Sequence, residues 1–576
     1  VLDGEKLIRE YWAKQPKPIP VAEALALKNT SPSINSKILS SVGRPPANDS
    51  DVNYEATIER HISGDVKSTS PILISSTSEF DVLGLTGSGL FGFDWNLAPF
   101  ASADTVVSWE TSKDKMYDKV VMRKDLTWSD GKPMTAHDVA FSFRTIMNPK
   151  IPIPAVRSGT NELRWVEAYD DYTVVFFHKQ ALATNIWNVN FPILPRHVYE
   201  DSIAEDVTLV NSKHHVKFEN NPVCSGPYVI TTRRRGQEIV LERREGYYMF
   251  EGKQVRNKPY FKRIRFSVIE DGNTALLALK SGKLDEMILT PEQWTSQTGG
   301  SDFYKHNTKA TGQEYTYFYF GWNNESDYFS DKKTREAMSY AFDHDEMLKT
   351  MYHGLYEPCQ GIFHPASWMF PKKPGKIYKQ DLEKAYELLQ EAGWEDTDND
   401  GVLDKVVDGK RIPFQFTILT ANKPDRVKLC NLLKVNLDQL GIRCTVRPVE
   451  FTTLQELMGK RKFDAYFGGW GSGADPDTSE NVWTTDAIKT GRNYLSYSHP
   501  KVDQLFLDGK AEYDREKRAA IYAKIHEQIY NDHPCTFLYY QSSFYGFNKN
   551  LRGYMFSPRG PYNYSPGFNS IWSATK

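Results

Sequence analysis

The sequence predicts an α/β protein that folds as more than one domain. A chain of 576 residues is too long for one hydrophobic core, because single cores stop growing at about 250 to 300 residues. In the second half, stretches with apolar residues at helical spacing alternate with short apolar runs. This alternation is typical of a sheet that helices cover on both faces. Residues 121–147 show the same step from strand to helix in the first half.

The best-specified element is the stretch of residues 121–147. Residues 121–128 form an extended run, and residues 129–132 (Ser-Asp-Gly-Lys) have turn chemistry, because Asp bonds its own backbone and Gly tolerates positive φ. Thr135 is expected to cap a helix after this turn, with Asp138 near its positive end. The apolar face of that helix consists of Val139, Phe143, Ile146 and Met147.

Residues 1–55 contain many Pro, Ser and Asn residues and are expected to form a short helix near residues 5–14 followed by a linker. Strand-like patterning begins at residue 56. Residues 87–92 read GSGLFG and match the dinucleotide-binding pattern GxGxxG on paper. That site needs a helix to open inside the pattern, and Pro99 with the residues before it would interrupt one. We therefore expect a connection there.

The remaining elements follow from apolar spacing. Helices are expected at residues 334–342, 382–392, 425–440 and 515–531, and strands at residues 315–320, 414–419, 442–446, 463–470 and 537–540.

The charge balance argues against a nucleic-acid partner. Lys and Arg number 71, Asp and Glu 73, and the formal net charge is -2, so a polyanion has no global electrostatic support. The basic residues at 233–265 are interspersed with Glu and favour a solvated hairpin. No apolar run approaches the roughly 20 residues that span a bilayer, and no signal-peptide pattern opens the printed sequence.

The numbers of aromatic residues and cysteines narrow the possible kinds of protein further. The chain has 32 Tyr, 31 Phe and 13 Trp residues, which suit either a core or a cleft that stacks on a ligand. Its five cysteines are too few and too odd for a disulfide framework. One bridge, between Cys430 and Cys444, is compatible with a helix that packs on the strand after it.

Several strings resemble one protein family. Residues 128–133 read WSDGKP and residues 135–143 read TAHDVAFSF; residues 192–197 read PILPRH, residues 224–228 read CSGPY and residues 281–285 read SGKLD. Together they are similar to the extracellular solute-binding proteins of family 5, the oligopeptide-, dipeptide- and nickel-binding type that serves ABC importers.

This resemblance implies an α/β, two-lobe periplasmic-binding-protein (flytrap) fold with an inserted extra domain, built from mixed sheets flanked by helices. On that plan residues 1–55 are an N-terminal extension and linker. Lobe 1 comprises residues 56–108, 225–312 and 490–576, the inserted domain residues 109–224, and lobe 2 residues 313–489.

The implied function is capture of an oligopeptide or similar small solute between two hinged lobes and its delivery to the permease subunits of an ABC importer. The protein would be a monomer outside the cytoplasmic membrane or in the periplasm, attached to the membrane only through a lipid anchor. The alternative from another class is an α/β hydrolase that acts on a peptide or glycoside. GxSxG, HExxH and phosphate-loop motifs are absent, and His526-Glu527 lacks the second His of HExxH.

The loop after the expected strand at 463–470 is the main candidate binding site, since ligands of open α/β sheets bind outside the carboxyl ends of strands. In peptide-binding relatives this loop reads GW.ADY.DP, and its first Asp receives the peptide's α-ammonium. Here Gly473 stands in place of that Asp and the loop is one residue shorter. Either Asp475 takes the role, or the ligand carries no free α-ammonium. The candidate substrate-binding residues are Trp470, Gly471, Ser472, Asp475, Tyr317, Asn323 and Thr77.

No cofactor is required by these patterns, but one loop has the spacing of a calcium site. Residues 396–404 read DTDNDGVLD, with Gly at the sixth position as in an EF-hand, whereas the twelfth position is Val407 instead of Glu. The loop is predicted either to bind a structural calcium ion or to form a solvated turn. Its oxygen ligands would be Asp396, Asp398, Asp400 and Asp404.

Overall fold

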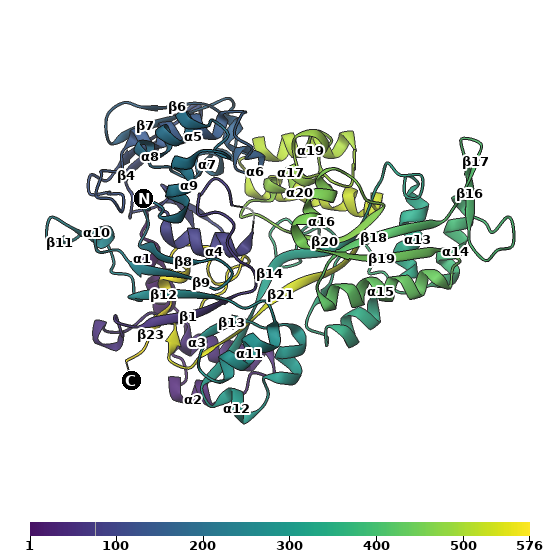
Figure 1. Cartoon of the computed structure of the whole chain (residues 1–576), viewed down its shortest axis with the longest axis horizontal. Coiled ribbons are helices and arrows are strands. Elements are labelled where there is room, and N and C mark those ends of the chain that lie inside the picture. Colours follow the sequence, from purple (N-terminus) through teal and green to yellow (C-terminus); the bar gives the residue numbers. More distant parts are fainter. Residues whose placement is uncertain (75, 576) are drawn as a thin grey trace. The chain divides into compact units, whose positions relative to one another are not determined.

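The computed structural model describes residues 1–74 and 76–575 and divides the chain into two compact units. Unit 1 comprises Val1–Gln313 and Ser543–Lys576, and unit 2 comprises Glu314–Ser542. The chain passes from unit 1 to unit 2 within strand β14 (Asn307–Trp322) and returns within strand β21 (Cys535–Asn548) (Figure 1). The start of unit 2 at Glu314 lies next to residue 313, where lobe 2 was predicted to begin.

The main sheet of unit 1 combines parallel and antiparallel strands. Strand β1 pairs in parallel with β12 and β13, whereas β9 pairs antiparallel with both β12 and β8. The bounds are β1 (Thr57–Ile62), β8 (Tyr228–Arg234), β9 (Glu238–Arg243), β12 (Arg263–Val268) and β13 (Glu286–Ile288). Helix α11 (Gly272–Lys280) packs against β13.

The first 55 residues do not form a separate extension and linker, as the sequence suggested. They contain helices α1 (Gly4–Ala13), α2 (Val21–Ala26) and α3 (Pro32–Val42). Ile38 and Val42 of α3 are fully buried in the core that also contains Ile58 and Phe266 of the main sheet. Apolar residues at helical spacing in α3 thus join this segment to unit 1, although its Pro and Ser content resembles that of a linker.

A second, antiparallel sheet in unit 1 covers much of the predicted insertion at residues 109–224. Its strand order is β4 (Val106–Thr111), β5 (Tyr117–Met122), β7 (Thr173–His178) and β6 (Leu163–Ala168). Helices α5 (Ala136–Met147), α8 (Arg196–Glu205) and α9 (Lys213–Asn220) accompany it. Its core also includes Ile72 and Phe91 from outside the insertion, so the division of unit 1 into lobe and inserted domain stays a prediction.

Helix α5 begins as the sequence predicts. Thr135 is the N-cap, and Asp138 completes a capping box with it. Oδ2 of Asp138 accepts the backbone N–H of Thr135 at 2.8 Å and the indole N–H of Trp128 at 3.3 Å. The same carboxylate accepts the backbone N–H of Arg196 through Oδ1 at 2.9 Å. One buried side chain therefore connects the WSDGKP and PILPRH strings.

The sheet of unit 2 is covered on both faces, as the alternating pattern predicted. Along β18 (Gln415–Ala421), Phe416 and Ile418 face one core while Leu419 and Ala421 face the other. Its strand neighbours are β19 (Arg443–Val449) and β20 (Ala465–Gly471), both parallel to it, and β20 pairs antiparallel with β14. The first core is closed by α13 (Lys332–Ala341), α14 (Leu382–Glu391) and α15 (Pro424–Asp438), and the second contains α16 (Phe451–Gly459).

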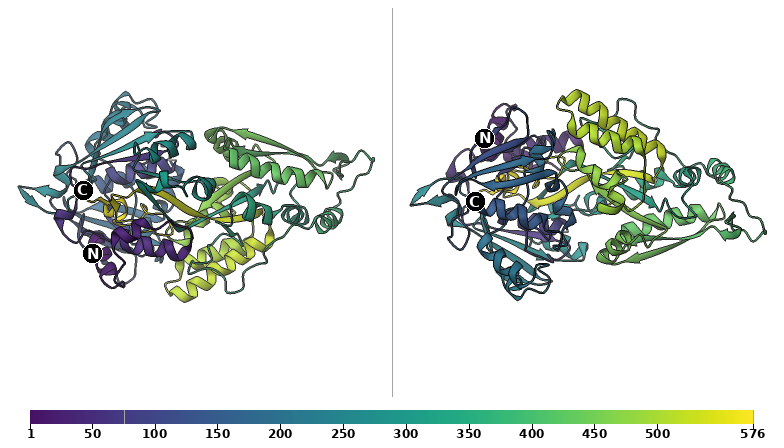
Figure 2. Two further views of the ribbon diagram at one scale, coloured as in Figure 1. Left: turned by 90° about the horizontal axis from the view of Figure 1, so that it is seen from below. Right: turned by 90° about the horizontal axis from the view of Figure 1, so that it is seen from above.

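The return to unit 1 lies at Ser543, not near residue 490 as the resemblance suggested. Helices α19 (Pro500–Ala511) and α20 (Arg515–Asp532) bury Phe506, Tyr522 and Ile525 in the second core of unit 2. Figure 2 shows these two yellow-green helices side by side within that unit in both views. Their amphipathic pattern predicted helices correctly but does not specify which core they cover.

Two further expectations concern local chemistry. All five cysteines are buried free thiols, so the bridge between Cys430 and Cys444 is not formed. Burial raises the pKa of both thiols to about 12.

No helix opens within residues 87–92, because helix α4 (Thr77–Thr86) ends before them and strand β2 (Phe91–Phe93) begins at their end. Among the described helices, none combines the length and apolar composition needed to cross a bilayer.

Candidate functional site

Strand β20 contains a half-buried tryptophan near its carboxyl end. Trp470 lies opposite Tyr317 in the β14–β20 ladder, and its side chain is partly exposed. The guanidinium of Arg492 lies 4.8 Å from the Trp470 ring centroid, and the ring of Tyr494 lies 6.0 Å away. A partly exposed ring with a cation over it can stack on a ligand, so this geometry is compatible with the predicted binding role of Trp470.

The next positions fix the backbone of the loop. Gly471 is exposed, and the buried Ser472 donates its backbone N–H to the carbonyl of Tyr315 at 2.7 Å. A Cβ atom at Gly473 would lie 2.4 Å from Oγ1 of Thr478, closer than real Cβ contacts. The N–H of Gly473 donates to this same Thr478 hydroxyl at 3.1 Å. A carboxylate therefore does not fit at position 473 in this loop conformation.

Asp475 is buried and fully engaged by Arg518 of α20. The two terminal nitrogens of Arg518 lie 2.7 Å from Oδ2 and 2.7 Å from Oδ1 of Asp475. Although burial alone would lower it, the bonds to Asp475 hold the pKa of Arg518 above its ordinary value. Oδ1 of Asp475 also accepts the N–H of Asp477 at 3.0 Å. This carboxylate is thus compensated from within unit 2 and offers no free charge to a ligand ammonium.

A second acid of the loop, Asp477, lies in the same polar cluster. Burial raises its pKa to about 7, with Glu480 and Asp475 adding to the rise and Lys510 opposing it. Tyr522 donates its hydroxyl to Asp477 at 3.0 Å. The Lys510 ammonium lies 4.0 Å from Asp477 and 2.6 Å from Glu480.

Two predicted binding residues instead have structural roles. Tyr317 is 3% exposed, and its hydroxyl accepts the indole N–H of Trp483 at 3.0 Å. Tyr317 lies on β14, where a strand was predicted, but the face of the strand on which it lies is filled by the second core of unit 2. Asn323 follows β14; its amide donates to the carbonyl of Phe463 at 3.1 Å and its oxygen accepts the N–H of Glu325 at 3.1 Å. The side chain of Thr77 lies outside the described part of the structure.

The acidic loop brings three of its four predicted ligands together. Carboxylate oxygens of Asp396, Asp398 and Asp404 lie within 4.8 Å of one another. Each already has protein partners: Asp398 pairs with Arg411, Asp404 accepts Thr397 Oγ1 at 2.7 Å, and Asp396 accepts the N–H of Gly401 at 3.0 Å. Asp400 accepts the N–H of Val402 at 2.8 Å instead. The calcium site stays a prediction.

His526, the residue that begins an incomplete HExxH string, has both ring nitrogens engaged. Nε2 lies 2.6 Å from the carbonyl oxygen of Gln360, and Nδ1 accepts the N–H of Phe363 at 3.2 Å. Burial lowers its pKa to about 4, so the ring is a neutral structural link between α20 and a loop.

Unit 1 contains an apolar cavity that the sequence analysis did not predict. Its volume is about 260 Å³, and three of the recognised strings supply parts of its wall: Trp128, Ile193 and Cys224. The strings meet because Ser129 and Cys224 exchange hydrogen bonds at 2.8 and 2.9 Å. A Cβ atom at Gly226 would lie 2.6 Å from the backbone of Thr86, which requires glycine in the CSGPY string. The strings identified the family that the chain resembles, but nothing in their local sequence shows that they enclose a cavity.

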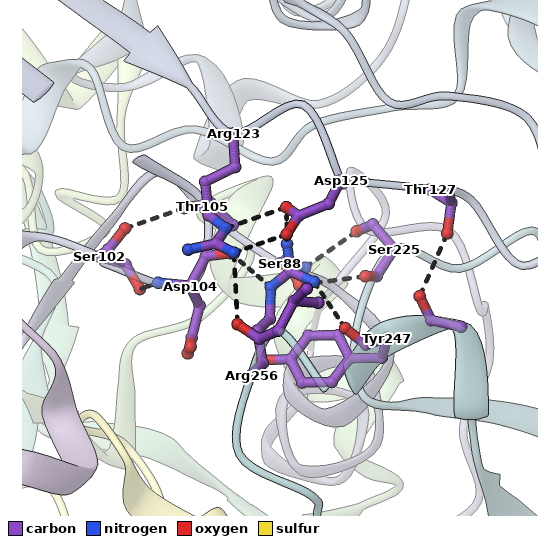
Figure 3. Close-up of polar contacts among 12 residues, drawn as sticks. Ser88, Ser102, Asp104, Thr105, Arg123, Asp125, Thr127, Ser225, Tyr247 and Arg256 are labelled. Carbon is purple, nitrogen blue, oxygen red and sulfur yellow. Dashed lines mark hydrogen bonds and ion pairs between the residues drawn. The ribbon is translucent and has the colours of Figure 1, made fainter. Parts of the chain in front are cut away.

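A second, polar cavity of about 230 Å³ lies beside the first in unit 1 and shares Phe80 and Ser88 with it. Burial raises the pKa of the Asp81 carboxyl in its wall to about 6. Figure 3 shows a neighbouring cluster in which Arg256 donates to Asp125 and to the carbonyl oxygen of Tyr247, each at 2.6 Å.

Residues 102–491 match the family described as bacterial extracellular solute-binding proteins, family 5 Middle. The oligopeptide-binding protein AppA of Bacillus subtilis (strain 168) is 31% identical over 454 residues, which cover 76% of this chain and 78% of AppA.

Solved structures give the same grouping. The structure of AppA from Bacillus subtilis in complex with a nonapeptide superimposes with a TM-score of 0.79 at 28% identity, covering 91% of this chain and 100% of that chain. NikZ from Campylobacter jejuni in complex with Ni(L-His) has a TM-score of 0.74 at 24% identity, covering 90% and 99%, and supports the fold alone. None of these relatives favours the hydrolase alternative. The chain therefore belongs to family 5 of the bacterial extracellular solute-binding proteins.

Proposed function

We propose that this protein captures an oligopeptide or peptide-like solute outside the cytoplasmic membrane and delivers it to the permease subunits of an ABC importer. The observation that carries the proposal is the similarity to AppA, which is named an oligopeptide-binding protein and whose structure contains a nonapeptide. Trp470 supports it, because a half-buried indole beside Arg492 offers a stacking surface.

The ligand that this loop favours carries no free α-ammonium at the position where peptide-binding relatives place one. Gly473 has no room for a Cβ atom, and Asp475 is neutralised by Arg518. An ammonium buried beside this loop would lack a carboxylate partner, at a cost of several kcal/mol. Blocked peptides, or solutes whose amine is derivatised, meet this requirement.

The proposed role is binding without catalysis. His526 is held by two protein partners, and burial lowers the pKa of His344 and His364 to about 4, which leaves neutral rings in structural positions. Binding without turnover, as a monomer and with a lipid anchor as the only membrane attachment, fits a transport receptor. Closure of two lobes on the solute stays a prediction of the resemblance, and small-angle scattering with and without ligand tests it.

Matched peptides test the ligand preference. We expect calorimetry with N-acetylated and free-amine versions of the same pentapeptides to show tighter binding of the acetylated members. The expected ratio is at least about tenfold, or 1.4 kcal/mol. Equal or tighter binding of the free amines would contradict the proposed preference while leaving peptide binding itself intact. Release of cleaved products during incubation would contradict the non-catalytic role.

A further inference from the structure

The apolar cavity of unit 1 has walls of a kind that suits a ring. It is lined by Phe80 and Leu83 of α4, Trp128 of the WSDGKP string, Phe191 and Ile193 of the PILPRH region, and Phe218 of α9. An apolar cavity of about 150 Å³ binds benzene, so a volume of about 260 Å³ accommodates a substituted benzene or an indole. Aromatic walls add edge and face contacts to such a ligand.

One buried polar side chain in this wall has no hydrogen-bond partner within the described part of the chain. His215 on α9 is 3% exposed, and neither of its ring nitrogens has a partner among the described residues. Its ring packs in a T-shaped arrangement on the Tyr199 ring, with centroids 5.5 Å apart, and interacts electrostatically with the Glu219 carboxylate. Leaving a buried polar group unpaired costs about 1 to 3 kcal/mol, so the protein gains when something else bonds to this imidazole.

Polar groups of Tyr199, Glu219, Ser225 and Ser88 at the cavity wall already have hydrogen-bond partners within the protein. The Tyr199 hydroxyl lies 2.8 Å from Ser70 Oγ, and Glu219 accepts the Ser68 hydroxyl. Ser88 donates two hydrogen bonds to Ser225, from its N–H to the Ser225 hydroxyl at 2.9 Å and from its hydroxyl to the Ser225 carbonyl at 3.1 Å (Figure 3). His215 is thus distinguished from its neighbours, and a ligand needs one polar group only, placed at the imidazole.

We propose that this cavity is a second binding site, which takes an aromatic ring bearing one hydroxyl or N–H group, of phenol or indole type, with that group hydrogen-bonded to His215. A neutral imidazole has one donor and one acceptor nitrogen, so a phenol can both give and receive while an indole gives. The ring is either a free small molecule or the side chain of a Tyr or Trp residue in a bound solute. The second source rests on the proposed function, whereas the first does not.

Two variants and one control separate the parts of this proposal. His215→Phe keeps an aromatic ring and removes both nitrogens. Gly84→Leu extends a side chain from a cavity-lining position of α4 where a Cβ atom meets nothing within 4 Å, and it replaces a helical glycine, which by itself favours the helix. Gly459→Leu, at the end of α16 in unit 2, is the matched control, because its Cβ atom also meets open space.

Calorimetry and thermal shift with p-cresol, indole and toluene give the test. We expect the wild type and Gly459→Leu to bind p-cresol about tenfold more tightly than toluene, since a net hydrogen bond contributes about that factor. Gly84→Leu should lose all three ligands. His215→Phe should bind p-cresol and toluene equally and melt at a higher temperature, because an unpaired polar ring has been removed. Equal p-cresol preference in wild type and His215→Phe, or ring binding that Gly84→Leu leaves unchanged, would overturn the site.

Peptides distinguish the two sources of the ring. If the site receives a solute's side chain, N-acetylated Ala-Tyr-Ala should bind the wild type more tightly than N-acetylated Ala-Phe-Ala, and His215→Phe should remove the difference. If the ring is a free molecule, p-cresol binds and the two peptides do not differ. No binding of p-cresol at about 10 mM, together with equal affinity for the two peptides, would refute the second site. Peptide binding that all variants retain would leave the proposed function standing.

Discussion

Arg518 bonds both carboxylate oxygens of Asp475, with each nitrogen–oxygen distance at 2.7 Å. The two residues are 8% and 6% exposed and stand 43 positions apart in the sequence. Bidentate geometry of this kind is the strongest form of an Arg–carboxylate pair. It removes from the β20 loop the one carboxylate that the sequence offered as an ammonium partner.

The first prediction concerns this pair. Asp475→Asn leaves a buried guanidinium without its counter-charge, which costs about 3 to 5 kcal/mol of folding free energy. Chemical denaturation should show this loss, whereas the affinity for acetylated peptides should change little in the folded protein. The double variant Asp475→Asn with Arg518→Met should recover most of the stability. Loss of peptide affinity at unchanged stability would instead make Asp475 a ligand-binding residue.

The second prediction concerns pH. The pKa of Asp477 is raised by burial to about 7, whereas an unfolded Asp titrates near 3.9. Between these values the folded state holds a proton that the unfolded state has released, so stability should decrease as pH rises from about 4 to 7. The groups that face Asp477 are Asp475, Glu480, Lys510 and Tyr522.

Asp477→Asn tests this dependence. Thermal melting of the variant should change less than that of the wild type between pH 4 and 7, and the difference between the two should favour the variant most at pH 8. Asp327→Asn, at an exposed position of the same unit, should follow the wild-type profile. A wild-type stability that rises across this interval while Asp477→Asn is flat would contradict the assigned direction of the pKa.

The third prediction compares two tryptophans. Trp470 is partly exposed, whereas Trp483 is 1% exposed and bonded to Tyr317. Trp483→Ala should cost about 3 to 5 kcal/mol, the usual range for a core Trp, and Trp470→Ala clearly less. Trp470→Ala should weaken peptide binding and remove a ligand-dependent change in fluorescence. Equal destabilisation by both variants would identify Trp470 as a core residue.

The fourth prediction concerns the acidic loop. Arg411 pairs with Asp398 and lies 4.0 Å from Asp404. Its guanidinium therefore already balances part of the negative charge of these carboxylates. Chelators and added calcium should both leave the melting temperature of the wild type unchanged. Arg411→Ala frees the carboxylates and should gain a calcium-dependent increase in melting temperature by mass action. A fall in wild-type melting temperature on chelation would favour a resident calcium ion.

The sequence predicts local features well because their causes are local. Thr135 and Asp138 are three positions apart and specify the start of α5 wherever the helix packs. The Arg518–Asp475 pair depends on α20 covering unit 2, and an amphipathic face does not reveal which core it will join. This is why the expected return at residue 490 was wrong.

In the candidate site, too, features with local causes were predictable and features that depend on distant packing were not. Trp470 and its Gly-rich loop were predicted as a binding site because ligands bind beyond the carboxyl ends of strands. The structure places Trp470 at the carboxyl end of β20, and its role in binding stays a prediction. Tyr317 lies in the second core of unit 2, and a strand pattern in the sequence does not show whether other elements fill the face on which a side chain lies. The cavity around His215 is assembled from segments between residues 69 and 225, and no spacing in the sequence records that they enclose a volume.

The measurement that tests the account most directly is mass spectrometry of the solute that co-purifies with the full chain. Native spectra should show the protein carrying added mass, and denaturation should release one or more peptides, or peptide-like molecules, whose amino ends are blocked or derivatised. Re-addition of the released solute should restore the mass and raise the melting temperature by mass action. A ligand-free protein that binds no member of free and acetylated peptide libraries would contradict peptide capture, and a released peptide with a free amino end would contradict the role assigned to the Asp475–Arg518 pair.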